Sequence, residues 1–115
     1  MANFKSAQLI TGSLAKSGTS EVSLIAAMDV KNEDRVSFQF YNDDGDSGGD
    51  VVKVYGRLGA TAGTLGAASE WTQIGDNITV SGGASMLKSI ATTGLYWVGA
   101  TVTPATGSDN ITYAM

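Results

Sequence analysis

The sequence of 115 residues contains no cysteine and no histidine, and it has a single proline. Without thiols or imidazoles there is no disulfide framework, no zinc-finger or haem ligation, no thiolate nucleophile and no Ser-His-Asp or Cys-His machinery. No other catalytic signature stands in their place. The sequence therefore predicts a protein that is not an enzyme and that carries no cofactor.

Long apolar runs are also missing. The longest clean ones are Leu24–Met28 and Leu95–Ala100, far short of the roughly 18 to 20 residues that a membrane-spanning helix needs. The first residues, Met1–Ser6, contain one lysine and no apolar segment of the kind that a cleaved secretion signal requires. We therefore expect a cytoplasmic product with no membrane partner.

Charged residues are scarce, at 16% of the chain, against about a quarter in ordinary soluble domains. The basic residues are scattered singly, with no basic run to track phosphates, so nucleic-acid binding is disfavoured. Serine, threonine, glycine and alanine together make up nearly half of the chain. A low-charge surface of small side chains is expected of a protein that assembles with others.

The net charge of -4 is concentrated in one loop, Asn42–Asp50, and the remaining acidic and basic residues balance. Its acidic residues are the weak calcium candidates Asp43, Asp44, Asp46 and Asp50. Calcium takes six to eight oxygen ligands, but the spacing here does not match an EF-hand loop. We prefer to interpret the segment as a solvated turn or interface loop, in which aspartate and glycine satisfy turn geometry, and we predict no metal site.

Alternation of apolar and polar residues is the dominant pattern along the chain. It is clearest in Asp34–Asn42, where Val36, Phe38 and Phe40 face one way and the residues between them face the other. The other predicted strands are Ala7–Thr11, Glu21–Val30, Val51–Leu58, Glu70–Ile74, Asn77–Val80, Leu95–Thr103 and Ile111–Met115.

Turn signals separate these segments, and no domain boundary interrupts them. The sequence predicts an all-β fold, an antiparallel β-sandwich or jelly roll of about eight short strands in a single domain, 1–115. Ala84–Ile90 fits a helical turn or a strand almost equally well. Strand alternation predicts that Val22, Leu24, Ala26, Met28 and Val30 share one face. It also predicts that Val52 and Val54 lie opposite Lys53, Tyr55 and Arg57, and that Tyr96 points inward while Trp97 points outward.

The aromatic residues allow two interpretations. Trp71, Trp97, Tyr41, Tyr55, Tyr96 and Tyr113 could form a platform for stacking sugars, but core and interface packing is the more common role of such residues. An outward-facing tryptophan is costly unless a partner covers it. We therefore predict Trp97 as the first contact residue and Trp71 as a second, with Phe4, Tyr113 and Met115 in terminal arms that need a partner.

Three stretches in the second half of the chain form a recognisable layout: Asp50–Gly59, Ser69–Gly75 with its Trp-containing strand, and Ile90–Thr103 with its Gly-x-Tyr strand. This layout resembles that of small virion proteins of tailed bacteriophages. Such proteins include head decoration, or cement, proteins and also tail and adhesion modules. The resemblance implies a sandwich on the outside of a capsid that bridges neighbouring major capsid subunits, often as a dimer or trimer, with no active site.

Two functions follow as expectations. The first is a non-enzymatic capsid decoration protein, located on the virion surface, with the major capsid protein and further copies of itself as partners. Such a protein stabilises the shell by binding its assembled state, and many copies strengthen a modest interface. The alternative is a carbohydrate-binding or host-adhesion module of a phage tail or fibre, which the aromatic residues and the acidic loop suggest.

Overall fold

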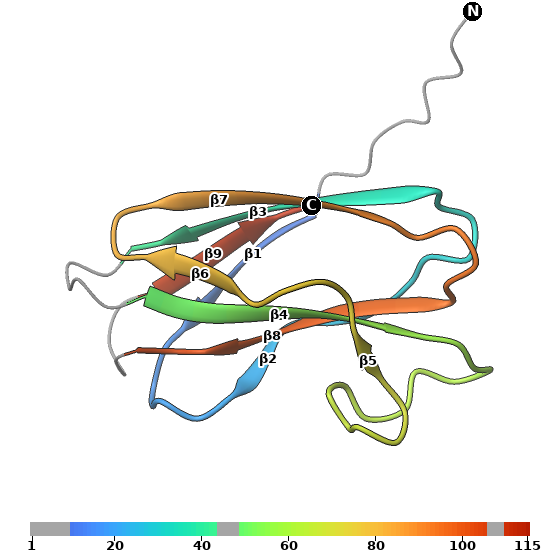
Figure 1. Cartoon of the computed structure of the whole chain (residues 1–115). Coiled ribbons are helices and arrows are strands. Elements are labelled where there is room, and N and C mark those ends of the chain that lie inside the picture. The colour runs from blue at the N-terminus through green and yellow to red at the C-terminus, as the bar shows by residue number, and fades with distance from the viewer. Residues whose placement is uncertain (1–9, 44–48, 106–109) are drawn as a thin grey trace, which may run out of the picture.

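The computed structural model describes residues 10–43, 49–105 and 110–115. These residues form nine strands in two antiparallel sheets packed face to face (Figure 1). In the described part of the chain there is no helix, and so none that could span a membrane. The all-β prediction is confirmed.

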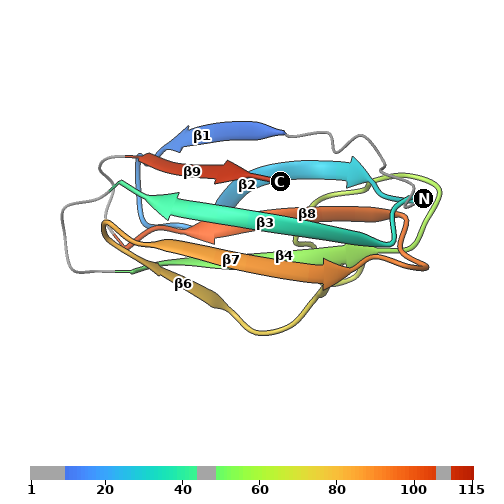
Figure 2. The ribbon, with the colours of Figure 1, turned by 90° about the horizontal axis from the view of Figure 1, so that it is seen from above.

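One sheet has four strands in the order β1-β9-β3-β7. Figure 2 looks down on this sheet, where the four strands follow one another in that order. Their bounds are β1 Thr11–Ala15, β3 Arg35–Asn42, β7 Ser85–Ala91 and β9 Asn110–Ala114.

The other sheet has five strands, in the order β2-β8-β4-β5, with β6 also paired to β4. Their bounds are β2 Val22–Asp29, β4 Gly49–Arg57, β5 Thr72–Gln73, β6 Ile78–Ser81 and β8 Trp97–Thr103. The segment Ala84–Ile90, for which the sequence allowed either a helical turn or a strand, forms strand β7. The described residues therefore contain nine strands, one more than the eight expected.

The strands pair in a nested order, in which strands near the two ends of the chain pair with each other and strands nearer its middle pair inside them. β1 pairs with β9, β2 with β8, β3 with β7, and β4 with both β5 and β6. This is the pairing of a jelly roll, in which one long hairpin is wrapped into two facing sheets. It brings the first and last strands of the chain side by side.

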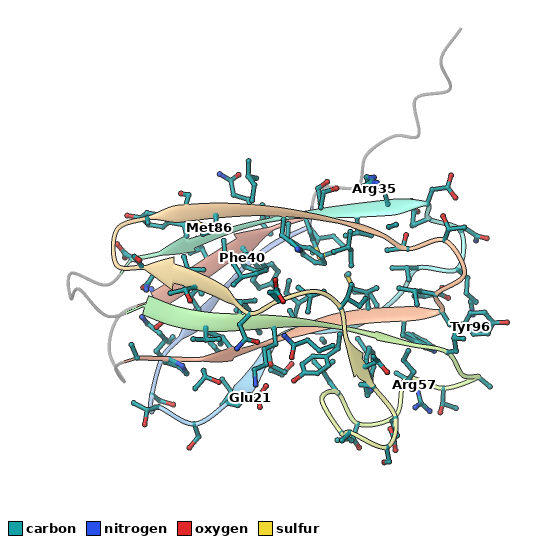
Figure 3. All side chains as sticks on the ribbon, viewed as in Figure 1. Glu21, Arg35, Phe40, Arg57, Met86 and Tyr96 are labelled. Atoms are coloured by element: carbon teal, nitrogen blue, oxygen red, sulfur yellow. The ribbon has the colours of Figure 1, made fainter. Side chains whose placement is uncertain are left out.

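The core lies between the sheets and follows the predicted alternation in β3 and β4. Phe38 and Phe40 are at most 1% exposed and stack with their ring centroids 5.9 Å apart; Figure 3 shows Phe40 between the sheets. Val52 and Val54 of β4 and Val98, Ala100 and Val102 of β8 cover them from the other sheet. Strands with an uninterrupted alternation thus supply buried residues to both layers of the core.

The predicted face of β2 is wrong in part. Leu24 and Ile25 are both buried, whereas Val22 and Ala26 are exposed. The register with β8 shifts twice along β2, between Ser23 and Ile25 and again after Ile25. An extra residue in one strand of a pair reverses the side-chain alternation beyond it, and these irregularities leave no signal in the apolar pattern.

The long connection between β4 and β5 folds back on the outer side of the five-stranded sheet, away from the other layer (Figure 1). Arg57 holds it in place, because its Nε donates to the Thr61 carbonyl at 2.9 Å and its Nη1 donates to the Glu70 carbonyl at 3.0 Å. Leu65 reaches Gly99 of β8, where an added Cβ would lie 2.7 Å from its Cδ1 atom. This part of the outer face is therefore covered by the chain itself.

Candidate functional site

The outer face of the four-stranded sheet is almost free of charge. The register places two rows of small or uncharged side chains across all four strands, Ser13–Thr112–Tyr41–Ser85 and Thr11–Ala114–Gln39–Leu87. Arg35, labelled in Figure 3, is the one charged residue on the outward side of β3, and it donates from Nη1 to the Ser89 hydroxyl at 3.0 Å. We call these outward-facing residues of β1, β9, β3 and β7 the neutral face.

Apolar side chains project from the neutral face. Leu87 is 75% exposed and Tyr41 is 39% exposed. A shallow groove of about 460 Å³ crosses the same face, lined by Thr11, Gly12, Ser13, Gln39, Tyr41, Thr112, Tyr113 and Ala114. Exposed apolar groups on a face that lacks charge are typical of protein contact surfaces.

Among residues 10–43, 49–105 and 110–115, each sheet also ends in strands with an unpaired side. β1 and β7 are the outer strands of the four-stranded sheet within the described residues. Such edges present backbone N–H and C=O groups that can pair with a strand of another molecule. The neutral face and its two edges thus form one continuous surface suited to lateral contact.

The predicted C-terminal arm is wrong. Residues Asn110–Ala114 form β9, which lies between β1 and β3. Tyr113 and Met115 are partly buried and pack against the core, and Met115 exchanges backbone hydrogen bonds with Ile10 at 2.9 and 3.0 Å. The C-terminus completes the sheet instead of reaching out, and Phe4, the N-terminal contact candidate, lies outside the described residues.

Substitution of Gly12 by alanine tests this placement of β9. A Cβ at Gly12 would overlap the ring of Tyr113, which packs across it. Overpacking of this kind costs about 1–3 kcal/mol, so we expect that loss in urea unfolding. Gly18→Ala is the matched control, because an added Cβ there meets nothing within 4 Å. Equal stability of the two variants would contradict the packing of Tyr113 under β1.

Neither tryptophan is fully exposed, as the prediction of surface contact residues requires. Trp71 is 3% exposed, so its predicted surface role is wrong for the isolated chain. The backbone N–H groups of Glu70 and Trp71 both donate to the Ala67 carbonyl, so a tight turn at the end of the β4–β5 connection positions Trp71. Its indole nitrogen is buried without a hydrogen-bond partner.

Trp97 is half-buried, and its Nε1 donates to the Gly59 carbonyl at 3.1 Å. The ammonium of Lys31 lies 5.7 Å from its ring centroid and 5.8 Å from that of Tyr96. Tyr96, expected inside, is instead 44% exposed, because it precedes β8 at the end of the sandwich (Figure 3). The same lysine lowers the pKa of the neighbouring Asp29 carboxyl, first through the hydrogen bond from the Lys31 backbone N–H and then through the Lys31 ammonium.

The six aromatic residues considered as a sugar platform do not share one surface. Trp71 is interior, Tyr113 packs on the core, and Tyr41 lies on the neutral face. Tyr55 lies on the opposite sheet, where its hydroxyl donates to Glu21 at 3.3 Å. Tyr41 and Tyr113 both line the groove of the neutral face, whereas Tyr96 and Trp97 lie together at the end of the sandwich, where Lys31 covers both rings.

The acidic loop does not present its residues as one set of ligands. Asp43 is exposed, Asp50 is completely buried in β4, and Asp44 and Asp46 lie outside the described residues. No group of three or more metal-ligating side chains occurs within 10–43, 49–105 and 110–115. The prediction of a solvated loop is therefore wrong for Asp50.

Asp50 belongs instead to a buried polar cluster that the sequence did not indicate. Its Oδ2 accepts a hydrogen bond from Lys16 Nζ at 2.9 Å, and both side chains have no exposed surface. Lys16 Nζ also donates to Asn42 Oδ1 at 3.0 Å, while Asn42 Nδ2 donates to the Val80 carbonyl at 2.8 Å. Asp50 Oδ1 accepts from the Ala105 N–H at 3.0 Å.

The cluster joins the two sheets at one end of the sandwich, on the left in Figure 1, where β1 and β3 end and β4 begins. Lys16 follows β1 directly, Asn42 ends β3, and Asp50 is the second residue of β4. The Lys16–Asp50 pair spans 34 positions in the chain. The sequence alone does not show that these residues meet, because their proximity depends on the order of the strands in the two sheets.

No protein-family model matches the chain, and no curated protein matches it. The function is therefore argued from the surface and the cluster described above.

Proposed function

We propose that this chain is a capsid decoration protein of a tailed bacteriophage, which docks its neutral face on the major capsid protein. The observation that carries the proposal is the neutral face itself, which has a single charge on β3 and projects Tyr41 and Leu87. The outer face of the other sheet differs, because it carries Lys53 and Arg57 and is partly covered by the β4–β5 connection.

A flat and nearly neutral face is suited to a shell protein for two reasons. Docking removes few charges from water, so little desolvation opposes it. Each copy also needs only a modest interface, because many copies bind a repeated surface and favour its assembled state. Strands β1 and β7, which are the outer strands of their sheet in the part of the chain that the structure describes, supply lateral contacts to further copies, which fits a dimer or trimer.

The topology supports the proposal at the level of analogy. Jelly rolls occur in viral capsid proteins and in lectins, although a fold by itself does not determine a function. The resemblance of the second half of the chain to phage virion proteins points to the first of these classes.

Leu87→Glu tests the docking face. The substitution adds a charge at the most exposed apolar side chain of the neutral face, so we expect at least a tenfold weaker affinity for isolated capsids, or about 1.4 kcal/mol. Binding is measured by co-sedimentation with shells that lack the protein. Lys53→Glu, on the outer side of the opposite sheet, is the control and should bind normally. Loss of binding in the control alone would contradict the assignment of the face.

The alternative function, a carbohydrate-binding or host-adhesion module, has support from one observation. Tyr96 is 44% exposed and lies beside Trp97 at the end of the sandwich. Binding on a glycan array that disappears in Tyr96→Ala, with capsid binding absent, would favour this function over the first.

A further inference from the structure

An amine, a carboxamide and a carboxylate meet in the buried polar cluster. Lys16, Asn42 and Asp50 each have at most 6% of their surface exposed. Lys16 Nζ contacts both of the others, at 3.0 Å from Asn42 Oδ1 and 2.9 Å from Asp50 Oδ2. A nucleophile, an electrophile and a proton carrier are thus held together in a site closed to solvent.

We propose that Lys16 and Asn42 join in an intramolecular isopeptide bond, with Asp50 carrying the proton. The bond links Nζ of Lys16 to Cγ of Asn42 and releases one molecule of ammonia. The chain performs this reaction once on itself, so the proposal is independent of the docking function.

The distance permits the attack. A carbonyl bond is about 1.2 Å long, so Nζ lies within about 4.2 Å of Asn42 Cγ, given its 3.0 Å contact with Oδ1. Reacting atoms in a near-attack arrangement are about 3–3.5 Å apart. A rotation of the flexible lysine side chain covers the difference, while the ends of β1 and β3 stay in place.

Proton transfer begins at the Lys16–Asp50 contact. Nζ gives one proton to Asp50 Oδ2 across 2.9 Å, which leaves a neutral amine and a neutral acid. Burial favours this exchange, because two charges are costly to keep away from water. The freed lone pair on Nζ is then the nucleophile.

The remaining steps balance without any further reactant. The amine adds to Asn42 Cγ, and the carbonyl electrons move onto Oδ1. Asp50 gives its proton to the leaving nitrogen, and the bond from Cγ to Nδ2 breaks to release NH₃. The attacking nitrogen then gives one of its two remaining protons to Asp50. The products are a secondary amide, NH₃ and a protonated Asp50, with nothing oxidised or reduced.

Two further contacts organise the site. The Val80 carbonyl accepts a hydrogen bond from Asn42 Nδ2 at 2.8 Å, which fixes the carboxamide plane. The Ala105 N–H donates to Asp50 Oδ1 at 3.0 Å, so Oδ2 is the oxygen that faces Lys16. Because these partners come from β6 and from the segment after β8, the site forms only when both sheets have assembled.

The bond would connect the end of β1 to the end of β3, across a separation of 26 positions. A covalent link of this kind restricts the unfolded chain as a disulfide does. In a chain without cysteine, it would attach the edge strand β1 covalently to β3.

Intact-mass spectrometry of the purified, folded chain tests the proposal. We expect a mass below that of the sequence by one ammonia, about 17 Da, in nearly all molecules. Trypsin should leave Lys16 uncut and yield a branched species that joins peptide 6–31 to peptide 36–53. The full sequence mass in folded protein would overturn the proposal, and so would a loss of water from a Lys16–Asp50 link.

Lys16→Arg is the matched control, because arginine keeps the charge opposite Asp50 but is not a nucleophile under these conditions. It should retain the full mass and fold, and Asp50→Asn should do the same if it folds. Loss of ammonia that persists in Lys16→Arg would assign the change to a succinimide at an asparagine and would contradict the isopeptide bond.

Discussion

Replacing Lys16 with methionine will lower the free energy of unfolding by about 3–5 kcal/mol, because the buried Asp50 and Asn42 side chains then lose the nitrogen that links them. The side chains of Lys16 and Asp50 have no exposed surface, and Nζ lies 2.9 Å from Oδ2, so no water can take the place of Nζ without a rearrangement of the sheet ends. Urea unfolding followed by tryptophan fluorescence measures the change.

Two companion variants separate the causes of that loss. Lys53→Met removes a lysine from the outer side of β4 and should stay within about 0.5 kcal/mol of the parent. Lys16→Arg keeps the charge and removes the covalent bond proposed above, so any stability it loses reports the bond. A Lys16→Met variant as stable as the parent would show that the cluster is open to solvent.

The substitution Phe38→Ala will cost a similar amount, about 3–5 kcal/mol, through lost burial and the cavity left behind. Phe38 is 1% exposed and stacks on Phe40, so the neighbouring ring also loses its support. Ser37→Ala, one residue earlier on the exposed side of β3, is the control and should be nearly neutral. A neutral Phe38→Ala would show that the wrong side of β3 has been placed inside.

The sequence predicted the sheets best where strands alternate without interruption. In β3 and β4 the buried residues recur at every second position, so the apolar pattern directly indicated Phe38, Phe40, Val52 and Val54. In β2 the register shifts twice, and the same reasoning failed there. Alternation is a reliable guide to a face only while the pairing with the neighbouring strand stays regular.

The site residues were harder to predict because their surroundings come from distant parts of the chain. Asp50 stands among glycines and aspartates that indicate a turn, and its partner Lys16 lies 34 positions away. Trp71 is 3% exposed although it stands at the end of the long β4–β5 connection, whose path no local pattern reveals. The neutral face could be anticipated only as a low overall charge; its location on one sheet required the strand order.

The central claim is that the neutral face docks on a capsid, and cryo-electron microscopy of intact virions tests it most directly. The account predicts the protein on the outside of the shell in icosahedral copy number, with β1, β9, β3 and β7 turned toward the major capsid protein. A few copies at the tail tip, or a shell-bound protein whose five-stranded sheet faces the capsid, would contradict it.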